Sequence, residues 1–212
     1  MGYSDGALRE GLLHEMVGRL HREDIREHSL EALTRRYHVD RQQAERVERT
    51  ALQALDQLEQ AWKLDQPHHR QMLRWAAETH EIGLSLSHSQ YHKHSAYLLQ
   101  NSDISGFTNL DKQQLALLVR SHRRKIPKEE FKLLPKTKQE TCRRLAVLLR
   151  LAALLHRNRS RARLPEFRLE YASKRLYLSF PRGWLEQHPL TKADLEQEAE
   201  YLKAFGLKLQ VA

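Results

Sequence analysis

Apolar residues recur at intervals of three or four along most of this chain, and this spacing predicts amphipathic helices. The clearest series starts after Asp40 with Ala44, Val47 and Ala51. The pattern predicts helices after Ser4-Asp5-Gly6, from Asp24, from Asp40, from Pro67, over residues 111–120, over residues 136–156 and over residues 191–205. The stretch LAVLLRLAALL (residues 145–155) is apolar nearly all round, which places its helix in the middle of a bundle.

After residue 164 the period changes from helical to alternating. Phe167, Leu169 and Tyr171 alternate with charged residues, and alternation returns over residues 176–180 after a turn at residues 172–174. This pattern predicts a β-hairpin, with Pro181 ending its second strand. A helix capped at Thr191 and closed by Gly206 should follow, and then a short strand over residues 207–211. The predicted fold is mainly α, a helical bundle followed by a small β-β-α-β unit (α+β).

The chain has 212 residues, of which 40% are hydrophobic and 30% charged, and this composition is typical of a soluble protein. No run of about 18 apolar residues occurs, so no transmembrane segment is expected, and the first residues do not resemble a signal peptide. The single cysteine, Cys142, excludes an internal disulfide and a thiolate zinc site. We therefore expect a reducing cytoplasm, with a peripheral place at the inner membrane left open.

Positive charge is concentrated in one block of the sequence. Residues 120–163 hold fifteen Lys and Arg against three Asp and Glu, so the block carries +12 and the rest of the chain −3. Such a block attracts polyanions through its long-range field and through direct pairing with phosphate oxygens. The alternative is a solvated basic face without a partner, but clustered cations favour a polyanion.

The stretch from residue 72 to residue 101 carries the candidate chemistry. A buried helix should deliver His80 and Glu81 to its C-terminal end, where Gly83 can stop it, and more histidines follow at positions 88, 92 and 94. The candidate metal ligands are His80, Glu81, His92 and His122. The favoured alternative is a set of neutral histidines that bind backbone carbonyls at helix ends, so no metal is expected here.

Some of these residues resemble the metal-dependent phosphohydrolases named for a His-Asp doublet. In the segment Gln43-Ala44-Glu45-Arg46-Val47, glutamine stands where that family has its first histidine ligand. The doublet itself becomes His80-Glu81, and the final aspartate falls near Ala152-Ala153 and is missing. The resemblance therefore implies an HD-like helical domain with a degenerate metal centre.

Nearly the whole chain resembles a second family, the bacterial exopolyphosphatases and guanosine pentaphosphate phosphohydrolases. The opening Ser4-Asp5-Gly6-Ala7-Leu8-Arg9-Glu10-Gly11 looks like the closing motif of their actin-like phosphatase domains. The segments that are similar to their C-terminal domains include His80-Glu81-Ile82-Gly83, Lys93-His94-Ser95-Ala96-Tyr97, Gly106-Phe107 and the run from Leu118 to Lys125. Of the two branches, the exopolyphosphatases are the better match to these motifs.

The resemblance implies a C-terminal accessory domain that binds long polyphosphate and supports a homodimer. Residues 1–20 would end the preceding actin-like domain and form a linker, residues 21–160 would be the HD-like helical domain, and residues 161–212 the small α+β unit. The full-length enzyme would release terminal orthophosphate from polyphosphate with Mg²⁺. Its catalytic N-terminal domain would precede Met1, so this fragment should be non-catalytic and hold no cofactor.

A track of cations would suit a polyphosphate chain, because the grip on a polyanion needs no base readout. If residues 157–163 are extended, their alternating arginines point the same way and form a second row; the alternative is a soluble loop. The expected polyphosphate-binding residues are Lys93, His94, Arg120, His122, Arg123, Arg124, Lys125, Arg157, Arg159 and Arg161.

Two other functions compete with this interpretation. The first is a metal-dependent HD-type phosphohydrolase that uses the histidines to cleave guanosine pentaphosphate or another phosphate ester or anhydride. The second is a nucleic-acid module that uses the same basic block. Nucleic acid is the weaker alternative, because few aromatic residues are interleaved with the cations to stack bases.

Overall fold

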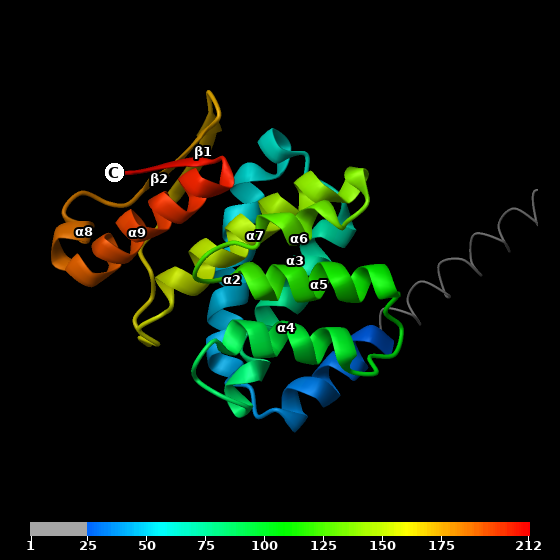
Figure 1. The fold of residues 1–212 in the computed structure, drawn as a ribbon. Coiled ribbons are helices and arrows are strands. Elements are labelled where there is room, and N and C mark those ends of the chain that lie inside the picture. Colours follow the sequence, from blue (N-terminus) through cyan, green and yellow to red (C-terminus); the bar gives the residue numbers. More distant parts are fainter. Residues whose placement is uncertain (1–24) are drawn as a thin grey trace, which may run out of the picture.

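The computed structural model describes residues 25–212, and it is a helical bundle with a small sheet at its C-terminal end (Figure 1). The predicted α+β class is therefore confirmed, whereas the helix expected after Ser4-Asp5-Gly6 lies outside the described residues. The bundle contains a helix over residues 25–36, α2 (Arg41–Trp62), α3 (Pro67–Thr79), the 3₁₀ helix η1 (Ile82–Ser85), α4 (Tyr91–Asn101), α5 (Asn109–Ser121), α6 (Lys128–Lys132) and α7 (Lys136–Leu155). The C-terminal unit contains β1 (Arg168–Ala172), β2 (Arg175–Ser179), α8 (Trp184–Gln187), α9 (Pro189–Phe205) and β3 (Lys208–Val211).

Helix α7 lies in the middle of the bundle, as its sequence predicts. It contacts α2, α3, α5, α6 and α9, and its leucines at positions 145, 148, 149 and 151 are buried. Even the one charged residue in the apolar stretch, Arg150, is completely buried. A helix that is apolar all round can bury every face only by taking such a central position.

Two helix starts follow from side-chain caps. Asp40 accepts a hydrogen bond from the backbone N–H of Gln43 (3.0 Å) and caps α2 as predicted. Helix α5 begins at Asn109, before the predicted residue 111, because Thr108 and Asp111 form a reciprocal capping box. Helix α9 begins at Pro189 rather than at Thr191, since proline at the first helical position needs no hydrogen-bond acceptor.

Gly83 does not stop the central helix, so that prediction is wrong. Helix α3 already ends at Thr79, and Gly83 belongs to η1. A Cβ atom at this position would overlap the carbonyl oxygen of Tyr91 and the backbone nitrogen of Ser95 in α4. The Ser95 hydroxyl also accepts a hydrogen bond from the N–H of Gly83 (2.9 Å). Gly83 is therefore a close-packing residue that lets η1 approach α4.

The C-terminal sheet has the order β1-β2-β3. Strands β1 and β2 form the predicted antiparallel hairpin, in which Leu169 is opposite Leu178, and a turn at Ser173 and Lys174 with positive φ angles joins them. Strand β3 returns after α9 and pairs with β2 in parallel. Helix α9 ends at Gly206, whose φ of 94° gives the left-handed cap that the sequence predicts.

The sheet and the bundle are joined by polar bonds as well as by a common hydrophobic core. The side chain of Gln57 in α2 accepts a hydrogen bond from the N–H of Leu169 (2.7 Å) and donates one to the carbonyl of Phe167 (3.3 Å). The proposed division at residue 160 stays a prediction. Within residues 25–212, each helix is too short or too polar to cross a bilayer.

Candidate functional site: a basic pocket beside a histidine cluster

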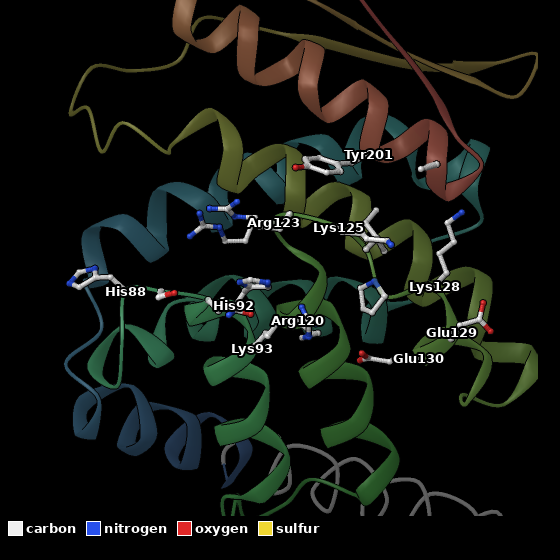
Figure 2. A pocket seen from close by; sticks show the side chains of 16 residues that line it. His88, His92, Lys93, Arg120, Arg123, Lys125, Lys128, Glu129, Glu130 and Tyr201 are labelled. Atoms are coloured by element: carbon white, nitrogen blue, oxygen red, sulfur yellow. The ribbon is translucent and has the colours of Figure 1, made fainter.

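A cavity of about 1020 Å³ opens where the start of α4, the end of α5, α6 and the end of α9 meet. Figure 2 shows His92 near its centre, with Arg123 and Tyr201 above it and Lys93 and Arg120 below it in that view. The cationic residues that line it are Lys93, Arg120, Arg123, Arg124, Lys125 and Lys128. We call this cavity the basic pocket.

None of these six cations forms an ion pair with a carboxylate of residues 25–212. Two acidic residues, Glu129 and Glu130, lie at the edge of the pocket, and Glu129 binds Lys132 rather than a lining cation (2.7 Å). The pocket therefore concentrates positive charge that the described part of the protein does not neutralise, which is the condition for attracting an anion.

The local backbone explains why these cations gather. Helix α5 ends at Ser121, and the segment that follows turns through Arg124, whose φ of 61° is left-handed. This turn brings the consecutive cations of residues 123–125 to one cavity, which a continued helix would distribute around its circumference. The guanidinium of Arg123 lies over the ring of Tyr91, 4.5 Å from its centroid, in a cation–π contact that orients it.

Three histidines form a cluster next to the basic pocket. The ring centroids of His80 and His122 are 5.2 Å apart, and those of His92 and His122 are 6.2 Å apart. His80 and His122 each place Nδ1 at 2.6 Å from a backbone carbonyl, that of Ala77 and that of Val119 respectively. The predicted alternative of histidines bound to carbonyls at helix ends thus describes two of the three.

Burial keeps this cluster uncharged. Desolvation lowers the pKa of His80, against the opposing effect of Glu81, and lowers the pKa of His122 well below its usual value. For His92 desolvation is again the first cause, and with Arg120 and Arg123 it brings the pKa to about 3. His92 is 3% exposed, and its Nδ1 has no hydrogen-bond partner within the described structure.

The four candidate metal ligands do not form a divalent-ion site. Both carboxylate oxygens of Glu81 accept hydrogen bonds from Nη2 of Arg159 (2.9 and 2.8 Å), and Nη1 of Arg159 binds Asp40 (2.9 Å). Nε2 of His80 is 3.9 Å from Glu81. In residues 25–212 no group of three or more histidine, cysteine or acidic side chains is arranged to hold a metal ion. A guanidinium, rather than an open ligand position, faces the carboxylate of Glu81.

The remaining positions of the degenerate centre also have structural partners. Gln43, at the position of the missing histidine, is buried and donates a hydrogen bond to the carbonyl of His156 (2.8 Å). Its side-chain oxygen accepts from Arg46 (2.8 Å). Ala152, near the position of the missing aspartate, is buried in α7. These residues fill the two positions and do not supply a metal ligand there.

The structure brings five of the ten expected anion-binding residues together in the basic pocket and places the other five elsewhere. Lys93, Arg120, Arg123, Arg124 and Lys125 line the basic pocket together. His122 is buried behind them, and His94 is half-buried with its Cβ against Gly83.

Of the two alternatives for residues 157–163, an extended row of arginines or a loop, the structure shows the loop. Arg159 has a left-handed φ of 53°, which breaks the extended alternation. Arg157 binds Asp194 (2.5 Å), and Arg159 binds Glu81 and Asp40. Arg161 is exposed and does not line the basic pocket. Whether Arg157, Arg159 or Arg161 contacts an anion stays a prediction.

Among the lining residues that sequence reasoning did not include, Lys128 and Tyr201 matter most for binding. Lys128 belongs to the same basic block and could have been included on charge alone. Tyr201 comes from α9, almost eighty residues further along the chain than Arg123, and no local pattern indicates it.

A family model described as "Ppx/GppA phosphatase, domain III" matches residues 25–199. The chain belongs to the Ppx/GppA phosphatase family. This result confirms the resemblance to the C-terminal domains of that family. The matched region contains the histidine cluster, the six lining cations of the basic pocket and most of α9, and it ends just before Tyr201.

Two bacterial relatives carry the same name. The guanosine-5'-triphosphate,3'-diphosphate pyrophosphatase of Aeromonas hydrophila is 38% identical over 97% of this chain and 42% of its own length. That of Pseudoalteromonas translucida is 36% identical over 100% of this chain and 42% of its own length. The chain thus spans about two-fifths of the length of these relatives. These relatives are named for the guanosine pentaphosphate branch of the family, whereas the sequence motifs suggest the exopolyphosphatase branch.

Proposed function

We propose that this chain is the C-terminal domain of a phosphatase that acts on guanosine-5'-triphosphate,3'-diphosphate, and that its basic pocket holds phosphate groups of that substrate. The observation that carries the proposal is the set of six lining cations without carboxylate partners among the described residues. Family membership and the names of the relatives support the choice of substrate.

The lining cations suit phosphate in two complementary ways. An arginine presents a planar fork of N–H donors that can bind two phosphate oxygens, whereas a lysine supplies a compact point charge. Because these six side chains have no ion pairs to break with described residues, a phosphate gains their attraction without first displacing a carboxylate. The neutral His92 lines the pocket without adding charge to an already repulsive group.

We place hydrolysis outside this domain. The Mg²⁺ expected for the reaction would be bound, together with the catalytic residues, by an N-terminal phosphatase domain, because the histidine cluster does not form a divalent site. Contact with that domain, a homodimer and a cytoplasmic location are further parts of the proposal.

Inorganic polyphosphate is a second candidate ligand. Its repeating phosphates would meet the same six cations, and nothing in a row of unpaired cations requires a nucleoside. Both ligands therefore predict binding that weakens with salt, and only a direct comparison of their affinities separates them.

The test is to measure how tightly this chain binds guanosine-5'-triphosphate,3'-diphosphate, by calorimetry at several salt concentrations. The double variant Arg123→Gln/Arg124→Gln should bind about tenfold more weakly and show a smaller salt dependence, because two phosphate-binding cations are lost. The matched control is Arg175→Gln/Arg182→Gln, which removes the same charge from exposed positions that do not line the pocket and should change affinity much less. Equal losses in the two variants would contradict a site at the basic pocket.

A second assay addresses the rival interpretation of hydrolysis by the histidines. This chain is incubated with Mg²⁺ or Mn²⁺ and the same nucleotide, and released phosphate is measured. We expect no release above the background of the buffer. Metal-dependent release that His80→Ala abolishes would place the reaction at the histidine cluster instead.

A further inference from the structure

A second cavity, of about 280 Å³, adjoins the basic pocket. Arg123, Arg124 and Tyr201 line both cavities, so they form a shared boundary. The other lining residues that matter here are Tyr91, Ala153, Leu154, Asp194 and Gln197. We call this cavity the side pocket.

The charges of the side pocket are balanced, unlike those of the basic pocket. Arg150 binds Glu198 through two hydrogen bonds (2.5 and 2.6 Å), and Arg157 binds Asp194 (2.5 Å). Apart from the two shared arginines, each cation of the side pocket therefore has its own carboxylate. A linear polyphosphate that continued from the basic pocket into this cavity would meet the carboxylates of Asp194 and Glu198, which repel it.

The walls of the side pocket suit a planar ring with hydrogen-bond donors. Tyr201 and Tyr91 offer aromatic surface, and Ala153 and Leu154 offer apolar surface. Asp194 is 32% exposed at its side chain, and only its Oδ1 accepts the bond from Arg157. Its second oxygen, Oδ2, is engaged by no described residue and can accept donors from a ligand.

We propose that the side pocket binds the guanine base of a nucleotide whose phosphates occupy the basic pocket. This inference rests on the proposed function and deepens it, because it names the part of the substrate that a polyphosphate chain lacks. Guanine carries two donors, N1–H and the 2-amino group, on the same edge, and the carboxylate of Asp194 accepts them. Adenine has an unprotonated N1 and no amino group at C2, so it leaves this carboxylate without a partner.

The residues shared by the two pockets would lie where the base side of such a nucleotide meets its phosphates. Arg123 and Arg124 reach phosphates on one side and the base on the other, and Arg123 already stacks on Tyr91 (4.5 Å). Tyr201 has the guanidinium of Arg150 5.6 Å from its ring centroid, a contact with a side chain that is itself fully buried. A base can thus lie in a preformed position while the phosphates remain among the unpaired cations.

The experiment compares three ligands on this chain at one salt concentration. They are guanosine-5'-triphosphate,3'-diphosphate, the corresponding adenosine nucleotide and a linear polyphosphate of similar charge. We expect the guanosine nucleotide to bind about tenfold more tightly than the adenosine nucleotide, which corresponds to about 1.4 kcal/mol. The variant Asp194→Ala should bring the ratio of the two nucleotide affinities close to one, even if the released Arg157 raises both affinities.

The control variant is Glu196→Ala, which removes one negative charge from the exposed side of α9 and lines neither pocket. It should leave the ratio unchanged.

Equal affinities for the two nucleotides, both sensitive to Arg123→Gln/Arg124→Gln, would overturn the guanine site and leave the phosphate-binding function intact. Guanine preference that survives Asp194→Ala would overturn the assignment to Asp194. Binding of polyphosphate without either nucleotide, or binding of no ligand at all, would overturn the proposed function and this inference together.

Discussion

Arg150 and Arg123 both line the side pocket, and they have opposite surroundings. Arg150 is completely buried, donates two hydrogen bonds to Glu198 and also donates to the carbonyl of Ser121. Arg123 is partly exposed, rests on Tyr91 and has no carboxylate partner among the described residues. The difference lies in what faces each side chain, because α9 supplies the carboxylate of Glu198 to Arg150, whereas α4 supplies the ring of Tyr91 to Arg123.

The other charged groups of the site can be classified in the same way, by whether a carboxylate pairs with them. Arg159 resembles Arg150 in having carboxylate partners, although its side chain is 42% exposed. The histidine cluster belongs to neither group, since burial keeps it neutral. A paired cation therefore holds helices together, whereas an unpaired one is available to a ligand, and four predictions test this division.

The largest effect should come from Arg150→Met. This change leaves the carboxylate of Glu198 buried without its partner, and burial already raises the pKa of Glu198 against the opposing effect of Arg150. We expect a loss of about 3 to 5 kcal/mol in the free energy of unfolding, measured by urea denaturation. The double variant Arg150→Met/Glu198→Leu should recover most of that loss, because it removes the unpaired charge. A single variant as stable as the unmodified chain would contradict a structural role for the pair.

The histidines should make stability depend on pH. His92 stays neutral in the folded state, where its pKa is about 3, but takes up a proton near pH 6.5 when unfolded. The unfolded state then binds more protons, so the stability falls as the pH drops below about 6.5. One such histidine accounts for about 2 kcal/mol between pH 7 and pH 5.

Urea denaturation of the variant His92→Gln at these two pH values measures this contribution. The variant should lose less stability on acidification than the unmodified chain does. The exposed His88 provides the control His88→Gln, which should retain the original pH dependence. Identical slopes in all three proteins would show that His92 is protonated in the folded state at pH 5, against its placement among Lys93, Arg120 and Arg123.

A smaller effect should follow Arg159→Ala. The buried carboxylate of Glu81 loses both of its hydrogen bonds to Arg159, but water can reach the vacated position because Arg159 is partly exposed. We expect a loss of about 1 kcal/mol in the free energy of unfolding by urea denaturation. The control is Arg161→Ala in the same loop, which should change stability by less than half as much. An equal loss in both variants would mean that the loop, and not the ion pair, determines stability.

These pairings explain how far sequence reasoning can go. The helices and the hairpin could be predicted because their apolar periods are local, and α7 could be placed in the middle because its own residues are apolar all round. Which cations are unpaired could not be predicted. The partners of Arg159 are 78 and 119 residues away, that of Arg157 is 37 residues away and that of Arg150 is 48 residues away.

The same limit applies to Gly83 and to two residues of α9, Tyr201 and Asp194. Gly83 looks like a helix stop in the sequence, and only the approach of α4 shows that close packing requires it. Tyr201 and Asp194 reach the pockets because α9 folds back onto α7. Five of the ten expected anion-binding residues line the basic pocket, four of them from the basic block, and whether they bind an anion stays a prediction.

The smallest effect on stability should come from the unpaired cations themselves. Arg123→Gln/Arg124→Gln should change the free energy of unfolding by less than about 0.5 kcal/mol, because neither side chain bonds to a described carboxylate. The sign should be stabilising at low salt, where removing two charges relieves repulsion among the six lining cations, and the gain should disappear as salt screens them. Urea denaturation at two salt concentrations measures both. A loss of several kcal/mol would show that these arginines are structural, and the weaker ligand binding expected of the same variant would then reflect a damaged fold instead of a lost contact.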